Sequence, residues 1–289
     1  MHPARSLLAF TTLSGMGFGL LFWLGIDPTP PKGWAALAFF AVAYALCLGG
    51  LAASSLHLRR RERALRAFSQ WRTSWLSREA WGALAALTVS GAYALPLLIG
   101  VAVLPLGWLA ALLSLATVGA TAMIYAQLRT VPRWHHWSTP ALFLLLSLTG
   151  GALLSGRVLI CSLLLVASAA LQAWVWWDGD RRFARSGTTL ASATGLGDRG
   201  TPRALFPPHT GSNYLLDEMV FVVGRRHAAK LRVIALVLMS GLPLVLLYLP
   251  PPHLFGLLAL VSHAAGVLVS RWLFFAEAEH VVGLYYGRR

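Results

Sequence analysis

The sequence predicts an all-α membrane protein whose helices cross the bilayer many times and pack as one bundle. Hydrophobic residues make up 57% of the 289-residue chain and charged residues only 12%, whereas a soluble domain carries about 25% charged residues. Apolar stretches of roughly 20 residues, the length that crosses a bilayer, follow one another along the chain. The stretches are continuous, which excludes the short alternating segments of a membrane β-barrel.

Eight such stretches can be marked, and we expect eight transmembrane helices in a single anchor domain of residues 1–289. Some connections are short turns rich in proline and glycine, such as DPTPPKG and LPPPH, whereas others are longer and polar. The expected spans cover residues 6–26, 34–55, 79–101, 105–128, 138–156, 158–177, 231–250 and 254–276.

The first span contains the segment GMGFG, in which Gly15 and Gly19 lie four residues apart on one helical face. Small residues at this spacing let two membrane helices approach closely. The segment does not match the glycine spacing of a dinucleotide-binding motif, and no strand precedes it. We therefore expect a helix-packing role for these glycines.

The distribution of Lys and Arg predicts the orientation of the chain. Of its 24 Lys and Arg residues, 22 lie on the face that holds both termini and the long connections 56–78, 129–137 and 178–230, and only Lys32 and Arg157 lie on the other. Positive residues near membrane spans are retained on the cytoplasmic side. We therefore expect a bacterial inner-membrane protein with both termini in the cytoplasm. The net charge of +14 also favours contact with anionic lipid or an acidic partner, and it does not predict nucleic-acid binding.

The connection 56–78 has the pattern of a basic helix or loop that lies in the membrane interface. Seven arginines occur within this segment, and they suit a face directed at lipid headgroups. Its apolar residues recur every three to four positions, as in an amphipathic helix: Leu65, Phe68, Trp71 and Trp75. A segment of this kind can also serve only to anchor and orient the neighbouring spans.

Two ionisable residues frame this segment, with His57 at the end of the second expected span and Glu79 at the start of the third. A carboxyl group at the edge of an apolar helix is costly and is treated first as a functional group. Glu79 can exchange a proton, and His57 can bond a carbonyl oxygen or a hydroxyl. Together they suit the two-electron, two-proton chemistry of a quinone. The alternative is that Glu79, with Ser77, only caps its own helix.

Two stretches of the chain resemble the membrane anchor subunit of dimethyl sulfoxide reductase. One is the pattern S-x-L-H-L, then R-A-F and L-S-x-E, within residues 54–81, and the other is MIYAQLRTVPRWHHWSTPALFLLLSLTGGALL at 123–154. Arg271, followed by aromatic residues in the last span, also fits. The resemblance implies a fold similar to the polysulfide reductase anchors, and it covers all the expected spans.

The resemblance also implies a quinone site and two partner subunits. Its histidine and glutamate fall on His57 and Glu79, and we add Ser77 and Arg78 of the L-S-x-E motif and Arg271 as candidate quinone-binding residues. The partners implied are an iron–sulfur subunit and a molybdopterin catalytic subunit. This sequence departs from the family where H-L-G-x-P is usual, because three arginines follow the H-L pair at 59–61.

The cofactor expected in this chain is a quinone, either menaquinone or ubiquinone, without haem, iron–sulfur cluster or other metal. Bis-histidine haem requires two facing histidines within spans, and only His263 lies clearly inside one. We expect His263 to bond a neighbouring helix. Cys47 and Cys161 stand alone in apolar stretches, which favours packing roles over cluster ligation.

The long connection 178–230 is expected to dock the partner. Its first half is polar and rich in glycine, and its second half predicts a short amphipathic helix with Asp217, Glu218, Met219, Phe221 and Val222. A helix that merely precedes the next span is the alternative.

Of the enzymes that this resemblance implies, dimethyl sulfoxide reductases place their soluble subunits across the membrane, whereas a similar sulfite dehydrogenase has them in the cytoplasm. The expected cytoplasmic orientation therefore favours the anchor of a sulfite dehydrogenase, which passes electrons from sulfite to quinone, over that of a dimethyl sulfoxide or other reductase that oxidises quinol. A transporter and a purely structural anchor are the remaining alternatives. A transporter would carry charged residues near the middle of the bilayer, whereas here they gather at the span edges.

Overall fold

The computed structural model describes residues 2–56, 61–206, 211, 213, 219 and 227–287, with the backbone alone at 61–64. Every regular element in these ranges is helical, as the composition predicts. The elements are α1 (Arg5–Gly25), α2 (Gly33–Leu56), the 3₁₀ helix η1 (Arg61–Phe68), α3 (Trp75–Leu98), α4 (Leu104–Ala126), α5 (Ser138–Leu154), α6 (Val158–Arg185), α7 (Leu190–Thr194), η2 (Gly197–Arg199), α8 (Ala228–Leu236), the π-helix η5 (Val237–Gly241), α9 (Leu242–Leu246), α10 (Pro252–Ala276) and η6 (Val281–Tyr286).

Seven of the expected spans are helices long and apolar enough to cross a bilayer within the described residues. They are α1, α2, α3, α4, α6, the continuous run from α8 to α9, and α10. The fifth expected span is an apolar helix of only 17 residues, α5, which is shorter than the others.

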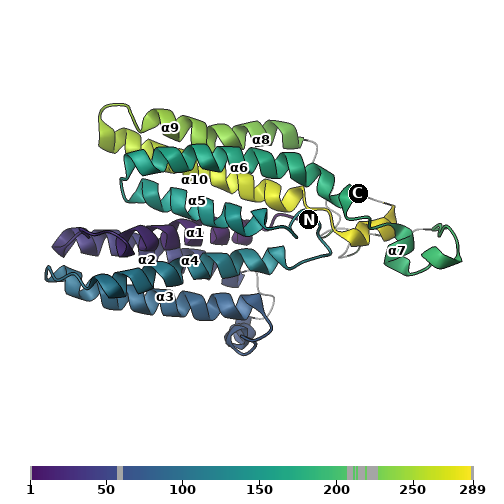
Figure 1. Cartoon of the computed structure of the whole chain (residues 1–289), viewed down its shortest axis with the longest axis horizontal. Helices are drawn as coiled ribbons and strands as arrows, with labels where there is room; N and C mark the ends of the chain where they lie inside the picture. The colour runs from purple at the N-terminus through teal and green to yellow at the C-terminus, as the bar shows by residue number, and fades with distance from the viewer. Residues whose placement is uncertain are drawn as a thin grey trace.

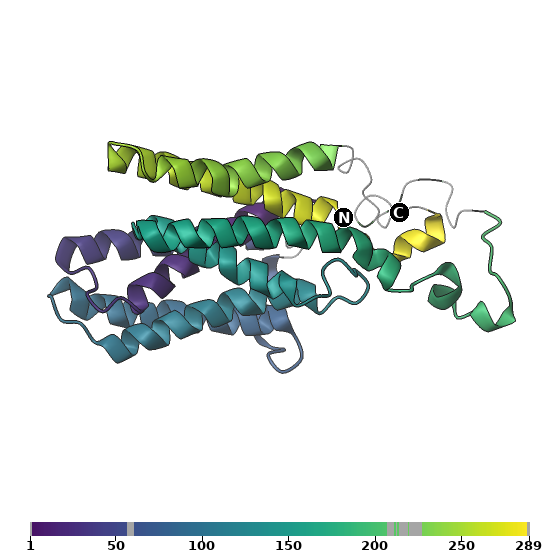
Figure 2. The ribbon, with the colours of Figure 1, turned by 45° about the horizontal axis from the view of Figure 1, so that its top comes forward.

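The long helices run side by side as a bundle, with α1 to α4 forming one part and α6, α8, α9 and α10 the other (Figure 1). α1 contacts α2, α4 and α5, and 13 of its 21 residues are buried, so it forms the centre of the bundle. The start of α1, the element η1, the short helix α7 and η6 all lie toward one end (Figures 1 and 2). We call this end the loop end.

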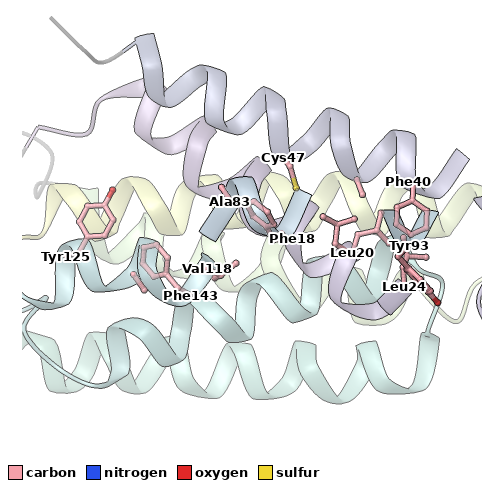
Figure 3. Close-up of a cluster of buried hydrophobic side chains, with 14 of the residues drawn as sticks. Phe18, Leu20, Leu24, Phe40, Cys47, Ala83, Tyr93, Val118, Tyr125 and Phe143 are labelled. Atoms are coloured by element: carbon pink, nitrogen blue, oxygen red, sulfur yellow. The ribbon is translucent and has the colours of Figure 1, made fainter. Parts of the chain in front are cut away.

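The buried apolar core runs along the length of the bundle (Figure 3). Phe40, Leu24 and Tyr93 lie at one end of it, and Tyr125 and Phe143 at the other. Cys47 and Cys161 are both buried and free, which confirms the packing role expected for them.

Close packing of α1 requires the absence of a side chain at Gly19, one of the expected pair, and also at Gly17. A Cβ atom on Gly19 would lie 1.9 Å from the carbonyl oxygen of Ser147 in α5, and one on Gly17 would lie 2.6 Å from Sγ of Cys47 in α2. A Cβ on Gly15 would meet nothing within 4 Å. The carbonyl oxygen of Gly15 accepts a hydrogen bond from the hydroxyl of Ser147 in α5 at 2.5 Å. Both expected glycines therefore contact α5, but only Gly19 requires the absence of a side chain.

The sixth helix continues well beyond the span that hydropathy predicts. α6 ends at Arg185, so residues 178–185 are helical and not part of a loop. Asp178 pairs with Arg182 at 2.6 Å, one turn later, and with Arg185 at 2.6 Å. These pairs, at helical spacing, stabilise the polar extension. Helical structure stops where Gly187 adopts a φ of +66°.

The basic connection after α2 is shorter and less regular than the amphipathic pattern predicts. A 3₁₀ helix covers Arg61–Phe68, turns follow, and α3 has already begun at Trp75. Leu65 and Trp71 are largely exposed, which suits contact with lipid. The position of this segment in the membrane interface remains a prediction.

His263 bonds a neighbouring helix, as the sequence predicts. The residue is fully buried in α10, and its Nδ1 lies 2.6 Å from the carbonyl oxygen of Met239 in η5. Ser262 donates to the carbonyl oxygen of Leu238 at 2.8 Å. Both side chains thus bond backbone carbonyls of the π-helix η5.

Candidate quinone site

Glu79 lies one turn inside α3, with its side chain directed into the bundle. The helix begins at Trp75, and its N-cap is Ser74, which makes no side-chain capping bond. Glu79 is only 5% exposed, and its Oε1 accepts a hydrogen bond of 2.5 Å from the hydroxyl of Thr121 in α4. The alternative in which Glu79 caps its own helix is therefore wrong, because the carboxyl group contacts the next helix instead.

Ser77 and Arg78 hold the connection that precedes α3. The buried Ser77 hydroxyl accepts a hydrogen bond from the backbone N–H of Gln70 at 3.2 Å. Arg78 donates to the carbonyl oxygens of Trp71 and Arg72 at 3.0 and 2.7 Å. Its guanidinium also lies 4.3 Å from the ring centre of Trp75. Arg78 is thus turned toward the loop, whereas Glu79 faces α4.

An open groove lies on the outer side of this connection. It has a volume of about 410 Å³ and is lined by Phe68, Trp71, Arg78 and Trp81. Trp81 donates to the carbonyl oxygen of Phe68 at 3.0 Å, and the two rings pack edge to face. Aromatic walls and a cation next to a membrane helix suit a flat, amphipathic molecule.

Several predicted residues lie outside the described residues. His57 is one of them. The same holds for the predicted amphipathic helix in the second half of 178–230, of which only Met219 is described.

Arg271 is buried in α10 near the loop end, with 3% of its surface exposed. Its guanidinium carbon lies 3.5 Å from the ring centre of Phe143. Within the described part of the chain, no carboxylate pairs with this arginine and its Nε has no hydrogen-bond partner. Because burial of an unpaired cation is costly, the residue suits a site that receives an electron-rich oxygen.

A narrow internal cavity connects Arg271 with the partner of Glu79. Arg271 and Thr121 both line it, together with Thr12, Met16, Phe143 and Ser147. The cavity measures about 10 Å³, close to the space that one water molecule needs. Arg271 therefore borders the cavity directly, and Glu79 is connected to it through Thr121. Ser77 and Arg78 do not line it.

A network of ion pairs closes the loop end next to this site. Arg133, in the connection between α4 and α5, pairs with Asp180 of α6 and lies 3.4 Å from Glu277. Arg232 of α8 bonds Asp180 and Glu277 at 2.7 Å each. The network therefore joins α6, α8 and the end of α10 to the connection between α4 and α5. Sequence reasoning did not find it, since its members are spread over 145 positions of the chain and look like ordinary span-edge charges.

Comparison with known proteins agrees with this architecture. The sequence model of the family described as "DMSO reductase anchor subunit (DmsC)" matches residues 2–173. Anchors of this family bind quinone, carry no haem, and assemble with iron–sulfur and molybdopterin subunits. A protein from Allochromatium vinosum, named as the C subunit of sulfite dehydrogenase, is 34% identical over 99% of each chain.

No solved structure matches the chain. The family match covers more than half of the sequence, and the relative from Allochromatium vinosum extends the likeness through Arg271 to the end of α10. The protein is thus a polytopic α-helical membrane protein that belongs to the DMSO reductase anchor subunit family.

Proposed function

We propose that this chain is the quinone-reactive anchor of a membrane-bound sulfite dehydrogenase. Two observations support sulfite as the substrate of the complex. The relative that matches nearly the whole chain is named as a subunit of sulfite dehydrogenase. The excess of Lys and Arg at the loop end favours a cytoplasmic position for that end. In this arrangement α5 also crosses the membrane, which brings the number of spans to eight. Both termini and the partner subunits are then cytoplasmic.

The reaction that the complex would carry out is balanced in electrons and protons. Oxidation of sulfite with one water gives sulfate, two electrons and two protons at the molybdenum subunit. The electrons pass through the iron–sulfur subunit to the anchor, where quinone takes up two electrons and two protons and becomes quinol. The anchor must therefore bind the ring close to its partner and supply protons to its oxygens.

Glu79 and Arg271 suit these two tasks. The carboxyl group of Glu79, held by Thr121, can deliver a proton to a reduced quinone oxygen. The guanidinium of Arg271 offers several donors in a fixed plane, and no carboxylate within the described residues occupies them. The unsatisfied, buried Arg271 is the observation on which the proposal chiefly depends.

The cavity bordered by Arg271 and Thr121 has room only for a water molecule. Entry of the ring therefore requires side chains around the cavity to move. Met16 lines the cavity, and its flexible thioether side chain can change rotamer at low cost. We propose that the quinone first binds in the outer groove next to Arg78 and then enters the cavity. His57 would donate a hydrogen bond to one of the ring oxygens.

The test is the effect of Glu79→Gln on the assembled three-subunit complex. Quinone-linked sulfite oxidation should fall by about 100-fold, whereas sulfite oxidation with an artificial electron acceptor that bypasses the anchor should be unchanged. Gln70→Glu, in the loop, is a control for altered charge near the same helix. Unchanged quinone turnover in Glu79→Gln would refute the assignment.

A further inference from the structure

A second cavity also borders Arg271. It measures about 20 Å³, which is enough for one water molecule. Arg271 lines this cavity as well as the first one, and the other polar residues around it include Arg133, Gln172, Ser270 and Glu277. Gln172 and Ser270 bond each other at 2.6 Å. A buried water needs two to four polar partners, and this cavity supplies them.

Glu277 faces this cavity with one unsatisfied oxygen. The residue is 5% exposed, and its Oε1 accepts a hydrogen bond of 2.7 Å from Nε of Arg232. Its Oε2 lies 3.4 Å from Nη1 of Arg133, but among the described residues no group donates a hydrogen bond to it. A buried carboxylate oxygen left without a donor is unfavourable, because it has lost its hydrogen bonds to bulk water. A donor is therefore expected in the adjoining space.

Arg271 has the complementary requirement. Its Nε is also buried without a hydrogen-bond acceptor in the described part of the chain. One water molecule between the two residues can accept from the guanidinium and donate to Oε2 of Glu277. Such a bridge is almost as favourable as a direct bond, and it connects the guanidinium of Arg271 to the negative charge of Glu277.

We propose that a water molecule in the second cavity joins Arg271 to Glu277, and that Glu277 thereby acts as a positioning residue for the quinone-binding arginine. The inference rests on the proposed function, in which Arg271 binds a quinone oxygen. Arg232 and Arg133 fix Glu277 from outside, and Asp180 fixes those two arginines in turn. The orientation of Arg271 is thus set by the ion-pair network at the loop end.

The experiment compares Glu277→Gln and Asp178→Asn in the three-subunit complex. Asp178 is a matched control, because it is a buried carboxylate at the same end that pairs with two arginines but does not line the second cavity. In Glu277→Gln the KM for quinone should rise on the order of fivefold with kcat changed less than about twofold. Asp178→Asn should leave the KM for quinone unchanged.

A double-mutant cycle separates positioning from a general structural effect. If Glu277 acts through Arg271, the change in KM caused by Glu277→Gln should disappear in an Arg271→Lys background. Val175→Ile provides a test that keeps every charge, because Val175 lines the second cavity and an added methylene would displace the water. It should raise the KM for quinone in the same direction.

An unchanged KM in both Glu277→Gln and Val175→Ile would overturn the inference, as would an equal effect of Glu277→Gln with and without Arg271. If the complex with Glu277→Gln does not assemble, the KM for quinone of Val175→Ile alone tests the inference. Failure of the proposed function would look different, since Glu79→Gln and Arg271→Lys would then themselves leave quinone kinetics unchanged.

Discussion

Thr121 donates its hydroxyl hydrogen to Oε1 of Glu79 across the interface between α4 and α3. The same hydroxyl lies 3.1 Å from the carbonyl oxygen of Thr117, one turn earlier in its own helix. The threonine therefore connects the acid of α3 to a fixed position on α4. Because Thr121 also lines the cavity that reaches Arg271, this bond sets where the carboxyl group meets that cavity.

Loss of this hydrogen bond should affect both stability and quinone turnover. In Thr121→Val the carboxyl group of Glu79 loses its donor, and the free energy of unfolding should fall by about 1–3 kcal/mol. Quinone-linked turnover should fall about tenfold, since the acid is no longer oriented. The measurement is steady-state turnover of the complex in detergent, together with thermal unfolding.

Thr117→Val is the matched control for this change. The hydroxyl of Thr117 bonds only the carbonyl oxygen of Leu113 in its own helix among the described contacts. Its removal should leave quinone turnover within about twofold, because helix carbonyls already have a backbone partner. Equal losses in the two variants would show that the effect is not specific to Glu79.

The contact between α1 and α5 predicts opposite tolerance at two glycines of one helix. In Gly19→Ala the added methyl group would overlap the backbone of Ser147, so the helices must separate and the free energy of unfolding should fall by about 1–3 kcal/mol. Gly15→Ala adds a methyl group in open space and should be neutral or slightly stabilising. Thermal unfolding of the two purified variants makes the comparison, and equal melting temperatures would contradict the packing described for Gly19.

Two histidines at the loop end should reduce stability as the pH falls. Burial lowers the pKa of His136 and that of His280, and in each residue Nδ1 accepts a backbone N–H, from Ser138 and from Val282. The folded state therefore binds fewer protons than the unfolded state, in which the histidine pKa is about 6.5. Stability is complete above that pH and is lost as the pH falls below it toward the lower, folded-state pKa.

The measurement is the melting temperature at pH 7.5 and pH 5.5. In His136→Asn the amide oxygen can accept the same N–H without being protonated. This variant should therefore lose less stability between the two pH values than the unmodified protein. A pH dependence identical in the two proteins would exclude His136 as a contributor.

The proposed orientation can be tested with single cysteines, because Cys47 and Cys161 are buried. Lys32→Cys lies between α1 and α2, and Arg199→Cys lies in η2 near α7. The reagent is a thiol label that crosses the outer membrane but not the inner membrane. Added to intact cells, it should label position 32 only. After the inner membrane is opened, position 199 should be labelled too. Labelling of position 199 in intact cells would place the loop end, and with it the partner subunits, on the outer side.

The sequence predicts the helical class and the approximate spans because hydropathy responds directly to the bilayer. It does not predict helix ends, since polar residues can continue a helix once ion pairs stabilise them. Asp178, Arg182 and Arg185 do this in α6. In α3 the helix begins four residues before Glu79, because Trp75 and Ser77 are compatible with a helix although the apolar run starts later. This small difference turns an acid at the membrane edge into an acid inside the bundle.

The candidate site was predictable only in part. Glu79 is visible in the sequence because a charge beside an apolar run is rare, and Arg271 because of the family resemblance. Thr121 carries no such signal, since a threonine in a span commonly bonds its own helix. Glu277 is equally inconspicuous, because its relation to Arg271 depends on a cavity that forms only when α5, α6 and α10 pack together.

The most direct measurement is a structure of the three-subunit complex with a quinone, or a quinone analogue that inhibits it, bound to the anchor. The account predicts one ring oxygen within hydrogen-bond distance of the Arg271 guanidinium, and the carboxyl group of Glu79 within reach of an oxygen directly or through one water. A ring bound elsewhere on the chain, with Glu79 still bonded only to Thr121 and Arg271 still paired with no ligand, would contradict it.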